Sequence, residues 1–337
     1  MKNNICIIAT GKGMGNFYSN IAYFKQIFNE EKTKLTIITR ELTSAKDVLS
    51  NQYFCKEVFY VKEYKRGIKG IFENLKSFMN IINLINQINP KKIFILHSSS
   101  RYTMASFFSK TDYDNIYAPG YRLQNFLIKK KNKIFKSYFS KGMEPKLENK
   151  LLVEKIYNKK ILFDNSIKLN LTHEKKYVCI TIAQSGISRQ WGKNNYIKII
   201  EYLITKGFKN FLILSGPSQK NIENEIYEYF ENQVNLVKTS HLKMLDCLNL
   251  LNNSIFYVGN DTGFPHLSIS LQIPTVVIHG DCVPHFHLYD EQNLIYSVDT
   301  LYPELRKPGS DSAIKTITFD QVKNSVDQLI ADHKLTL

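Results

Sequence analysis

The sequence predicts an α/β protein made of two doubly wound, Rossmann-like domains that face a central cleft. Three observations carry this prediction. Near the N-terminus a short apolar strand is followed by a glycine-rich turn, a helix and a second strand. The same alternation restarts at Tyr177, after an irregular stretch. The length of 337 residues is sufficient for two domains, each with its own core.

The first domain is expected to alternate strands with helices. The apolar run 4–9 predicts a buried strand, and the glycine-rich stretch 11–16 predicts a turn. Apolar residues at helical spacing over 68–88 predict a long amphipathic helix, which Pro90 ends. The other elements predicted in this domain are a helix over 17–28 and strands over 34–39, 58–61 and 92–96.

Residues 140–176 are less regular and richly charged, so we place the domain boundary in this stretch. We assign 1–165 to the first domain and 166–337 to the second. The final helix, 319–333, is a candidate to pack back on the first domain. The elements predicted in the second domain are strands over 177–182, 211–215, 255–258 and 275–278 and helices over 194–206, 222–230, 244–251, 266–271 and 319–333.

The composition is that of a globular protein, with a formal net charge of +15. Such a charge favours anionic partners such as phosphates, nucleic acid or an anionic membrane surface; a general lysine-rich composition explains it equally well. The five cysteines are scattered and form no C-x-x-C pair, which predicts free thiols in a reducing compartment. We expect no secretory signal and no membrane-spanning helix.

The most informative stretch is Val258–Gly280, which reads VGNDTGFPHLSISLQIPTVVIHG. It contains a strand, a polar turn, a helix and a second strand. The turn Asp261–Gly263 opens the helix at the carboxyl end of a strand. Backbone N–H groups at such a helix start bind anions well, so nucleotide phosphate is the first ligand to consider. Capping of the helix by Asp261 and Thr262 is the simpler interpretation, and the two roles can coexist.

This stretch also carries a resemblance. Its DTG-x-x-HL and PTV-x-x-x-G segments resemble the signature of the heptosyltransferase family of bacterial lipopolysaccharide assembly, glycosyltransferase family 9. Three further segments resemble that family in the same order along the chain. They are GKGMGNFYSNIAYFKQIF near the N-terminus, LHSSSRYTMASFFSK in the middle of the first domain, and FLILSGPSQKNIENEI in the second domain.

The resemblance implies the GT-B fold and an inverting, metal-independent transfer of a heptose from ADP-heptose to the inner core of lipopolysaccharide or lipooligosaccharide. It implies that residues 1–165 bind the acceptor and residues 166–337 the nucleotide sugar. No cofactor and no nucleic-acid partner are implied. The expected location is cytoplasmic, peripheral at the inner face of the inner membrane, where the basic surface would meet anionic lipid.

The resemblance assigns the donor site to three segments of the second domain. Asp261, Thr262, Gly263 and His266 match the family's pattern position by position, with His266 a candidate to orient the loop. In TIAQSGISRQW, Arg189 would direct a positive charge at the diphosphate. A solvated loop is the alternative for this segment, and Trp191 is expected in the core. The remaining predicted donor contacts are Ser185, Ser188, Ser215 and Gly216, with an ordinary strand-to-helix turn as the alternative for the last two.

The acceptor site is predicted around the first glycine-rich turn. The family's turn ends Gly-Asp, and that aspartate is its proposed base; here the pair is Gly15-Asn16, and an amide cannot take a proton. Asn16 is retained as a catalytic candidate beside Arg189, with helix capping as the alternative. Arg101 and Arg122 are predicted to grip acidic groups of the acceptor, with surface solvation as the alternative for each.

Two more segments carry hypotheses. Residues 121–139 mix lysine with large apolar side chains, which suits an anionic lipid surface or a helix with one buried face. Residues 281–287 contain Asp, Cys and His, but the spacing matches no closed zinc motif, and no metal site is assigned.

Two other functions stay open at this stage. A transferase of the same fold could use another nucleotide sugar. A non-catalytic nucleotide-sugar-binding protein is the second, because Asn16 stands where the family has aspartate.

Overall fold

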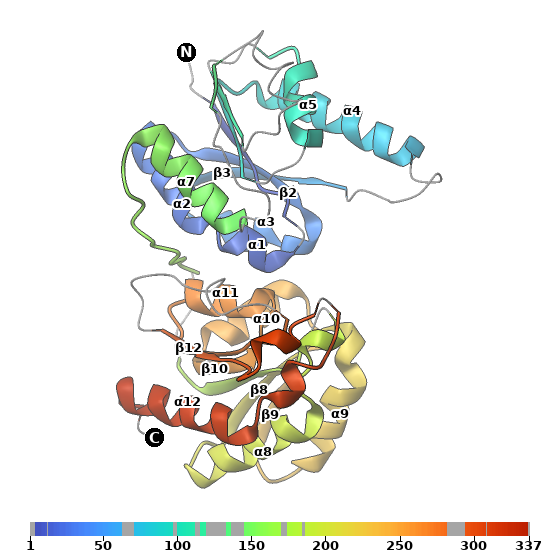
Figure 1. The fold of residues 1–337 in the computed structure, drawn as a ribbon, viewed down its shortest axis with the longest axis vertical. Helices are drawn as coiled ribbons and strands as arrows, with labels where there is room; N and C mark the ends of the chain where they lie inside the picture. The colour runs from blue at the N-terminus through green and yellow to red at the C-terminus, as the bar shows by residue number, and fades with distance from the viewer. Residues whose placement is uncertain are drawn as a thin grey trace. The chain divides into compact units, whose positions relative to one another are not determined.

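The computed structural model divides into two compact units, Met1–Asn165 and Ser166–Leu337. Each unit contains a parallel sheet with helices on both faces, so the predicted α/β class is confirmed (Figure 1). The residues whose structure is described are 4–11, 13–62, 71–96, 100–111, 115–118, 133–135, 145–169, 174–183, 186–281, 294–307 and 309–335.

The strands described in the first unit pair in the order β3-β2-β1-β4-β5-β6, all in parallel. They are β1 Ile5–Ile8, β2 Leu35–Arg40, β3 Cys55–Val61, β4 Lys92–Ile95, β5 Asn115–Tyr117 and β6 Lys133–Phe135. The helices described are α1 Met14–Tyr18, α2 Ile21–Glu31, α3 Ala45–Leu49, α4 Ile71–Ile88, α5 Ser100–Phe108 and α7 Pro145–Tyr157.

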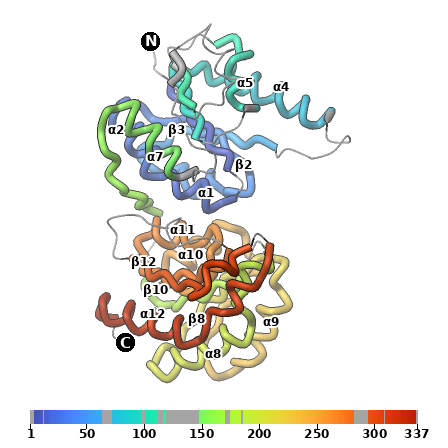
Figure 2. The backbone as a smooth tube through the Cα atoms, in the orientation of Figure 1, coloured from blue at the N-terminus to red at the C-terminus, as the bar shows by residue number. Residues whose placement is uncertain are grey.

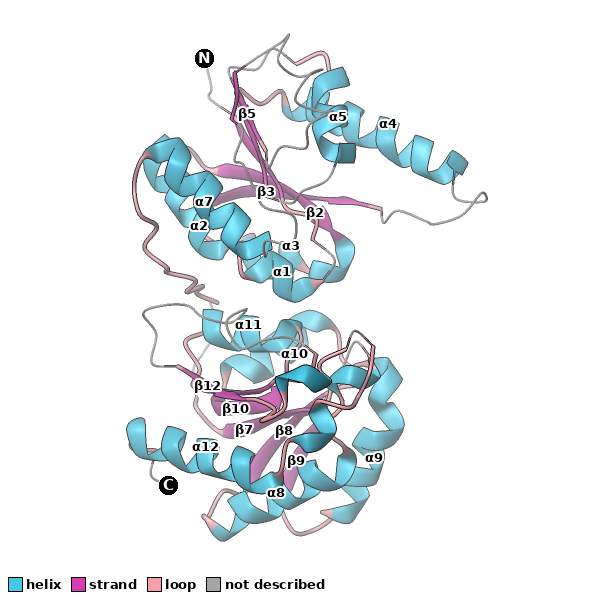
Figure 3. Ribbon diagram, in the orientation of Figure 1, coloured by secondary structure: helices cyan, strands magenta, loops and turns pink. Residues whose placement is uncertain are grey.

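Alternation along β1 divides the core of this unit between the two faces of its sheet. Cys6 and Ile8 share a fully buried cluster with Ile81 and Ile85 of α4 and Ala105 of α5. The helices α2 and α7 pack side by side on the other face, as Figure 3 shows. The apolar run predicted to be a buried strand is therefore buried on both faces.

The strands described in the second unit pair in the order β12-β11-β10-β7-β8-β9, again all in parallel. They are β7 Tyr177–Thr181, β8 Asn210–Leu214, β9 Asn235–Lys238, β10 Ser254–Asn260, β11 Thr275–Ile278 and β12 Ile295–Val298. The helices described are α8 Lys193–Thr205, α9 Lys220–Tyr229, α10 Met244–Asn252, α11 Gly263–Ser270 and α12 Phe319–Asp332.

The last helix, α12, begins with a capping box in which Thr318 and Gln321 bond each other's backbone. It packs against β11, β12 and α8 of its own unit. Val322, Val326 and Leu329 are fully buried in that unit's core. The apolar face of this helix is thus used within the second unit.

Several secondary-structure elements of the first unit differ from the sequence predictions. The helix predicted over 17–28 is two helices, broken at Ser19 and Asn20. The stretch predicted to be less regular contains α7, and the residues described directly after this helix, 158–169, have no helix or strand (Figure 2). Lys133–Phe135, predicted to lie in a helix or a lipid-binding segment, pairs with β5 as a strand. Backbone pairing fixes those residues in the sheet.

Candidate functional site

Both sheets have a switch point, where neighbouring strands continue to opposite sides of the sheet. In the second unit it lies between β7 and β10, and in the first between β1 and β4. Ligands of such sheets bind outside the carboxyl ends of the strands at this point. The segments predicted to bind the donor follow β7, β8 and β10, and the described residues predicted to bind the acceptor follow β1 and β4. The topology therefore brings each predicted set to one sheet edge.

The turn after β10 is held through its backbone. The Asp261 N–H donates to the carbonyl of Ile278 at 3.0 Å, and the Asp261 carbonyl accepts from Arg189 Nη1 at 3.0 Å. The Asp261 side chain is buried, with 5% exposed. Because the N–H and the carbonyl of Asp261 are both hydrogen-bonded, the backbone that leads into α11 is held at the sheet edge.

Thr262 is the N-cap of α11, and its Oγ1 accepts a hydrogen bond from the Phe264 N–H at 3.4 Å. Gly263 is the first residue of the helix, which begins three residues earlier than predicted. His266 lies in the first turn and is 7% exposed. Capping by Thr262 is confirmed, and the cap places the Gly263 N–H at the helix end that favours anions.

The loop after β7 contains a short 3-10 helix, Ile187–Arg189. Ser188 Oγ donates to Asp281 Oδ2 at 2.9 Å, and Arg189 Nε donates to Asp281 Oδ1 at 2.9 Å. The sequence predicted an arginine charge directed at the diphosphate. In the structure that charge is paired with Asp281, so Arg189 connects loops of the site. Ser185 lies outside the described residues.

A buried carboxylate organises the loops after β8 and β9. Glu223 of α9 is 1% exposed. It accepts from Ser215 Oγ at 2.6 Å, from the Thr239 N–H at 2.7 Å and from the Ser240 N–H at 3.1 Å. The Gly216 N–H donates to Gln219 at 3.3 Å. The hydroxyl predicted to meet the donor is therefore bonded within the protein.

Sequence reasoning missed Glu223, although a signal was present. Glu223, Ile226 and Phe230 stand at the i, i+3, i+7 spacing of one helix face, and all three are buried. A carboxylate at an apolar-face position needs several donors, because an unpaired buried charge is very unfavourable.

Buried polar side chains that carry no charge lie near the switch point of the second unit's sheet. Asn260, fully buried at the end of β10, accepts from the Tyr196 hydroxyl at 2.6 Å. Burial raises the pKa of Tyr196, and burial also raises the pKa of Tyr257 in the same strand as Asn260. Both phenols stay protonated through the physiological range, so they can donate hydrogen bonds and add no negative charge beneath the site.

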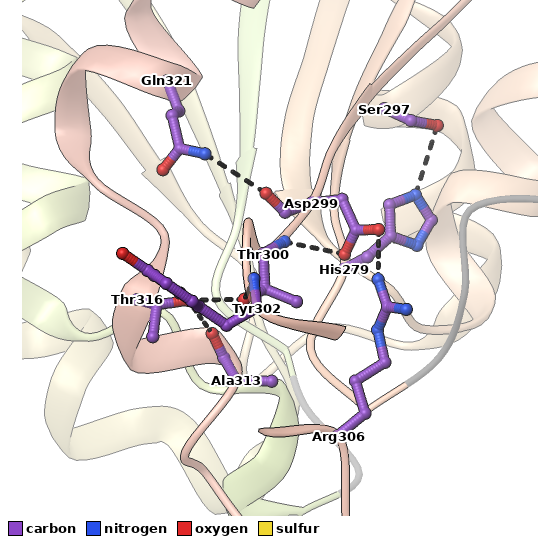
Figure 4. A network of polar contacts seen from close by, with 9 residues as sticks. All are labelled: His279, Ser297, Asp299, Thr300, Tyr302, Arg306, Ala313, Thr316 and Gln321. Atoms are coloured by element: carbon purple, nitrogen blue, oxygen red, sulfur yellow. Dashed lines mark hydrogen bonds and ion pairs between the residues drawn. The ribbon is translucent and has the colours of Figure 1, made fainter. Parts of the chain in front are cut away.

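A second polar network, missed by sequence reasoning, follows β11 and β12 (Figure 4). Asp299 pairs with Arg306 and accepts from the Thr300 N–H at 2.7 Å, while its carbonyl accepts from Gln321. His279 is buried, and its Nε2 lies 3.3 Å from Ser297 Oγ. These contacts fasten the segment after β12 to α12.

In the first unit, Gly15 and Asn16 are the second and third residues of α1. The N-cap of α1 is Gly13 and that of α2 is Asn20, so the capping interpretation of Asn16 is wrong. Asn16 is exposed. A Cβ on Gly11 would lie 2.8 Å from Asn16 Cβ, so glycine lets the turn close against this residue. The side chain is presented at the sheet edge.

Arg101 lies in the first turn of α5, directly after the loop that follows β4. Its Nη2 donates to Ser77 Oγ of α4, and the guanidinium lies 5.6 Å from the ring centre of Tyr102. The side chain is half-buried, which contradicts the alternative of simple surface solvation. Arg122 lies outside the described residues.

Residues 97–311 match the profile of glycosyltransferase family 9 (heptosyltransferase). The matched stretch is well over half of the chain. The chain belongs to this family. A stretch of 159 residues is 25% identical to lipooligosaccharide heptosyltransferase 2 of Haemophilus influenzae. That match covers 44% of this chain and 45% of the relative, so the chain spans less than half the length of that protein.

Solved structures agree with the family assignment at the level of fold. The family 9 glycosyltransferase of Veillonella parvula has a TM-score of 0.77 at 14% identity, covering 98% of both chains. The ADP-heptose heptosyltransferase II of E. coli has a TM-score of 0.73 at 13% identity, covering 98% of this chain and all of that one. E. coli WaaC with ADP has 0.73 at 13%, covering 97% and 99%. The predicted GT-B fold is confirmed.

The remaining expectations for this family 9 member are mixed. Trp191 is 4% exposed and donates to the Ile317 carbonyl at 2.8 Å, which confirms it as a core residue. Four cysteines are buried free thiols, as predicted: Cys6, Cys55, Cys179 and Cys247. Cys282 and residues 282–287 lie outside the described residues. Asp281, weighed as a metal ligand, is instead bonded to Ser188 and Arg189.

The described part of the chain has no helix that is long and apolar enough to cross a bilayer. Its His, Cys, Asp and Glu side chains form no group of three or more that could hold a metal ion. Of the segment 121–139, only the strand 133–135 is described.

Proposed function

We propose that this chain is an inverting glycosyltransferase that moves a heptose from ADP-heptose to the inner core of lipopolysaccharide or lipooligosaccharide. The observation that carries the proposal is the Asp261–Gly263 turn. It lies within the residues that match the family model, and it opens α11 beside the switch point of the second sheet. Backbone N–H groups there suit a diphosphate.

The proposed chemistry is a single displacement at the anomeric carbon. The bond from that carbon to the ADP oxygen breaks, while an acceptor hydroxyl oxygen bonds to the opposite face and the hydroxyl proton passes to solvent. Negative charge grows on the departing diphosphate, and the N–H groups at Thr262 and Gly263 stabilise it. In the first unit, Asn16 would hydrogen-bond the acceptor hydroxyl, and the charged Arg101 would bind its acidic groups. Alignment of the two reactants contributes much of the rate.

A non-catalytic nucleotide-sugar-binding role is the second candidate, and Asn16 favours it. An exposed carboxamide stands in the first turn of α1, where the family's aspartate is expected to take the proton. Under this alternative the second unit still binds the nucleotide, but no sugar is transferred. A transferase of the same fold with another nucleotide sugar differs only in the donor.

The decisive test is mass spectrometry of truncated lipooligosaccharide incubated with the protein and ADP-heptose. The expected result is a gain of one heptose residue. Thermal-shift measurements with ADP-, UDP- and GDP-sugars run in parallel, because a ligand that binds the folded state raises the unfolding midpoint. A higher unfolding midpoint with ADP-heptose but no gain in mass would support the binding-protein alternative. A larger rise of the midpoint with another nucleotide sugar would identify that sugar as the donor instead.

We further propose a cytoplasmic location at the inner face of the inner membrane. The net charge of +15 supports attraction to anionic lipid. Sedimentation with vesicles of phosphatidylglycerol should bind the protein at low salt and release it at high salt, because the attraction is electrostatic. Equal binding to neutral vesicles would contradict this proposal.

A further inference from the structure

Asp281 joins three loops at the carboxyl edge of the second sheet. It follows β11, and its carboxylate accepts from Arg189 Nε and Ser188 Oγ, each at 2.9 Å. Arg189 lies after β7, and its Nη1 in turn donates to the Asp261 carbonyl at 3.0 Å, after β10. The turn that begins α11 is thus connected through Arg189 to a carboxylate 20 residues further along the chain.

Gly280, directly before Asp281, lets the backbone approach the loop that carries Ser188 and Arg189. A Cβ on Gly280 would lie 1.9 Å from the Ser188 carbonyl oxygen and 3.3 Å from Ile314 Cδ1. The backbones of the two loops therefore touch at this point, and only glycine permits the contact. Because the loops meet one residue away, the Asp281 side chain reaches both Ser188 and Arg189 without a long, mobile linker.

The charges of the pair also matter for an anionic ligand. The side chains of Arg189 and Asp281 are 25% and 18% exposed, so water screens them only in part. An unpaired carboxylate at this edge would repel a diphosphate at the start of α11. Pairing with Arg189 cancels that repulsion, while the fork of the guanidinium keeps a second hydrogen bond for the Asp261 carbonyl.

We propose that Asp281 is a positioning residue for the donor site, acting through Arg189. It orients the guanidinium, which holds the Asp261 carbonyl and with it the N–H groups that open α11. The inference rests on the proposed function only in taking the ADP part of the donor as the ligand. It adds Asp281 to the donor site, whereas from the sequence alone this residue was weighed only as a metal ligand.

The test is the dissociation constant of ADP for the full-length protein, measured by isothermal titration calorimetry. Asp281→Asn keeps the size and can still bond Ser188, but it cannot pair the arginine charge. ADP should bind about tenfold more weakly, within the range of coupling found in ion-pair networks. Asp299→Asn is the matched control, since it breaks a similar pair two strands from the switch point and should leave ADP affinity within twofold.

The double variant gives a readout that a purely structural role would not produce. Arg189→Gln leaves the Asp281 carboxylate unpaired beside the diphosphate. Adding Asp281→Asn to it should therefore strengthen ADP binding, so that the same substitution has opposite signs in the two backgrounds. A role in folding alone would weaken binding in both.

Should Asp281→Asn not fold, Arg189→Lys tests the same geometry. Lysine keeps the charge but lacks the planar fork that bonds Asp281 and Asp261 together, so ADP should again bind about tenfold more weakly. Unchanged affinity in Asp281→Asn or Arg189→Lys, or a further loss in the double variant, would overturn the inference and leave the proposed function standing. Absence of ADP binding by the unmodified protein would overturn both.

Discussion

The two switch points of this protein handle charge in opposite ways. In the second unit, Arg189 is paired with Asp281, and the proposed donor edge is the N-terminus of α11. In the first unit, the partner observed for Arg101 among the described residues is the neutral hydroxyl of Ser77, and Asn16 is exposed. At the second edge the arginine is thus paired with a carboxylate, whereas the contacts described for Arg101 are with the neutral side chains of Ser77 and Tyr102.

This difference suits the two proposed ligands. A diphosphate is the same in every donor of one nucleotide, so N–H groups held in place bind it without reorganisation. An acceptor rich in phosphate and carboxylate groups is better met by an arginine whose described hydrogen-bond partner is a neutral hydroxyl. The comparison predicts that substitutions at the second edge change donor binding, and those at the first change transfer.

The largest effect is expected from Asn16→Asp in the first unit. A carboxylate at this position can take the acceptor proton, and general-base catalysis contributes about 10²–10⁴-fold to rate. We expect transfer to heptose-accepting lipooligosaccharide to rise by about a hundredfold. The rate should grow as pH rises through the ordinary aspartate pKa of about 4, because the ionised form is the base.

Asn16→Ala serves as the control for this substitution, and ADP affinity should stay the same in both variants. An equal transfer rate in Asn16→Asp and the unmodified protein would show that the base lies elsewhere. No transfer from either would favour the binding-protein alternative.

A smaller effect is expected from Gly280→Ala in the second unit. The added Cβ would meet the Ser188 carbonyl oxygen at 1.9 Å, so the two loops must separate. Overpacking of this kind costs about 1–3 kcal/mol. The thermal unfolding midpoint should fall and ADP affinity should fall with it. Gly13→Ala is the matched control in the first unit, where a Cβ would meet nothing within 4 Å. Equal midpoints for the two variants would contradict the close contact.

The smallest effect concerns two buried thiols, one in each unit. Burial raises the pKa of Cys55 and of Cys247 to about 11. Both thiols hold their proton in the folded state above the pH at which the unfolded chain loses it. Their contribution to stability is therefore complete below about pH 8.5 and lost as pH rises toward 11.

The same thiols report which unit binds the nucleotide. At pH 8, alkylation of each should be slow and should proceed through opening of its unit. ADP at three times its dissociation constant should slow the alkylation of Cys247 about fourfold, because ADP binds and stabilises only the folded second unit. Cys55 should react at an unchanged rate. Peptide-resolved mass spectrometry measures both, and equal protection would contradict a donor site confined to the second unit.

Local patterns were sufficient for the elements that bury one regular face. The apolar run before Gly11, the helical spacing up to Ile88 and the Asp-Thr-Gly turn all lie where the sequence placed them, within a few residues. The short strands β5, β6, β9 and β12 were missed. Equally short strands such as β1 and β11 were predicted because each is a fully buried, mainly apolar run. β9 and β12 are only partly buried and carry polar residues, so no apolar run marks them.

The sequence by itself determined the alternation of strand and helix, the family and the place of the Asp261 turn, because each depends on residues close together in the chain. Tertiary structure alone decided which loops share an edge. Arg189 and Asp281 are separated by 92 positions, and Glu223 meets Ser240 across 17. Such pairs form only when parallel strands place their carboxyl ends side by side, and the strand order that does so leaves no local trace in the sequence.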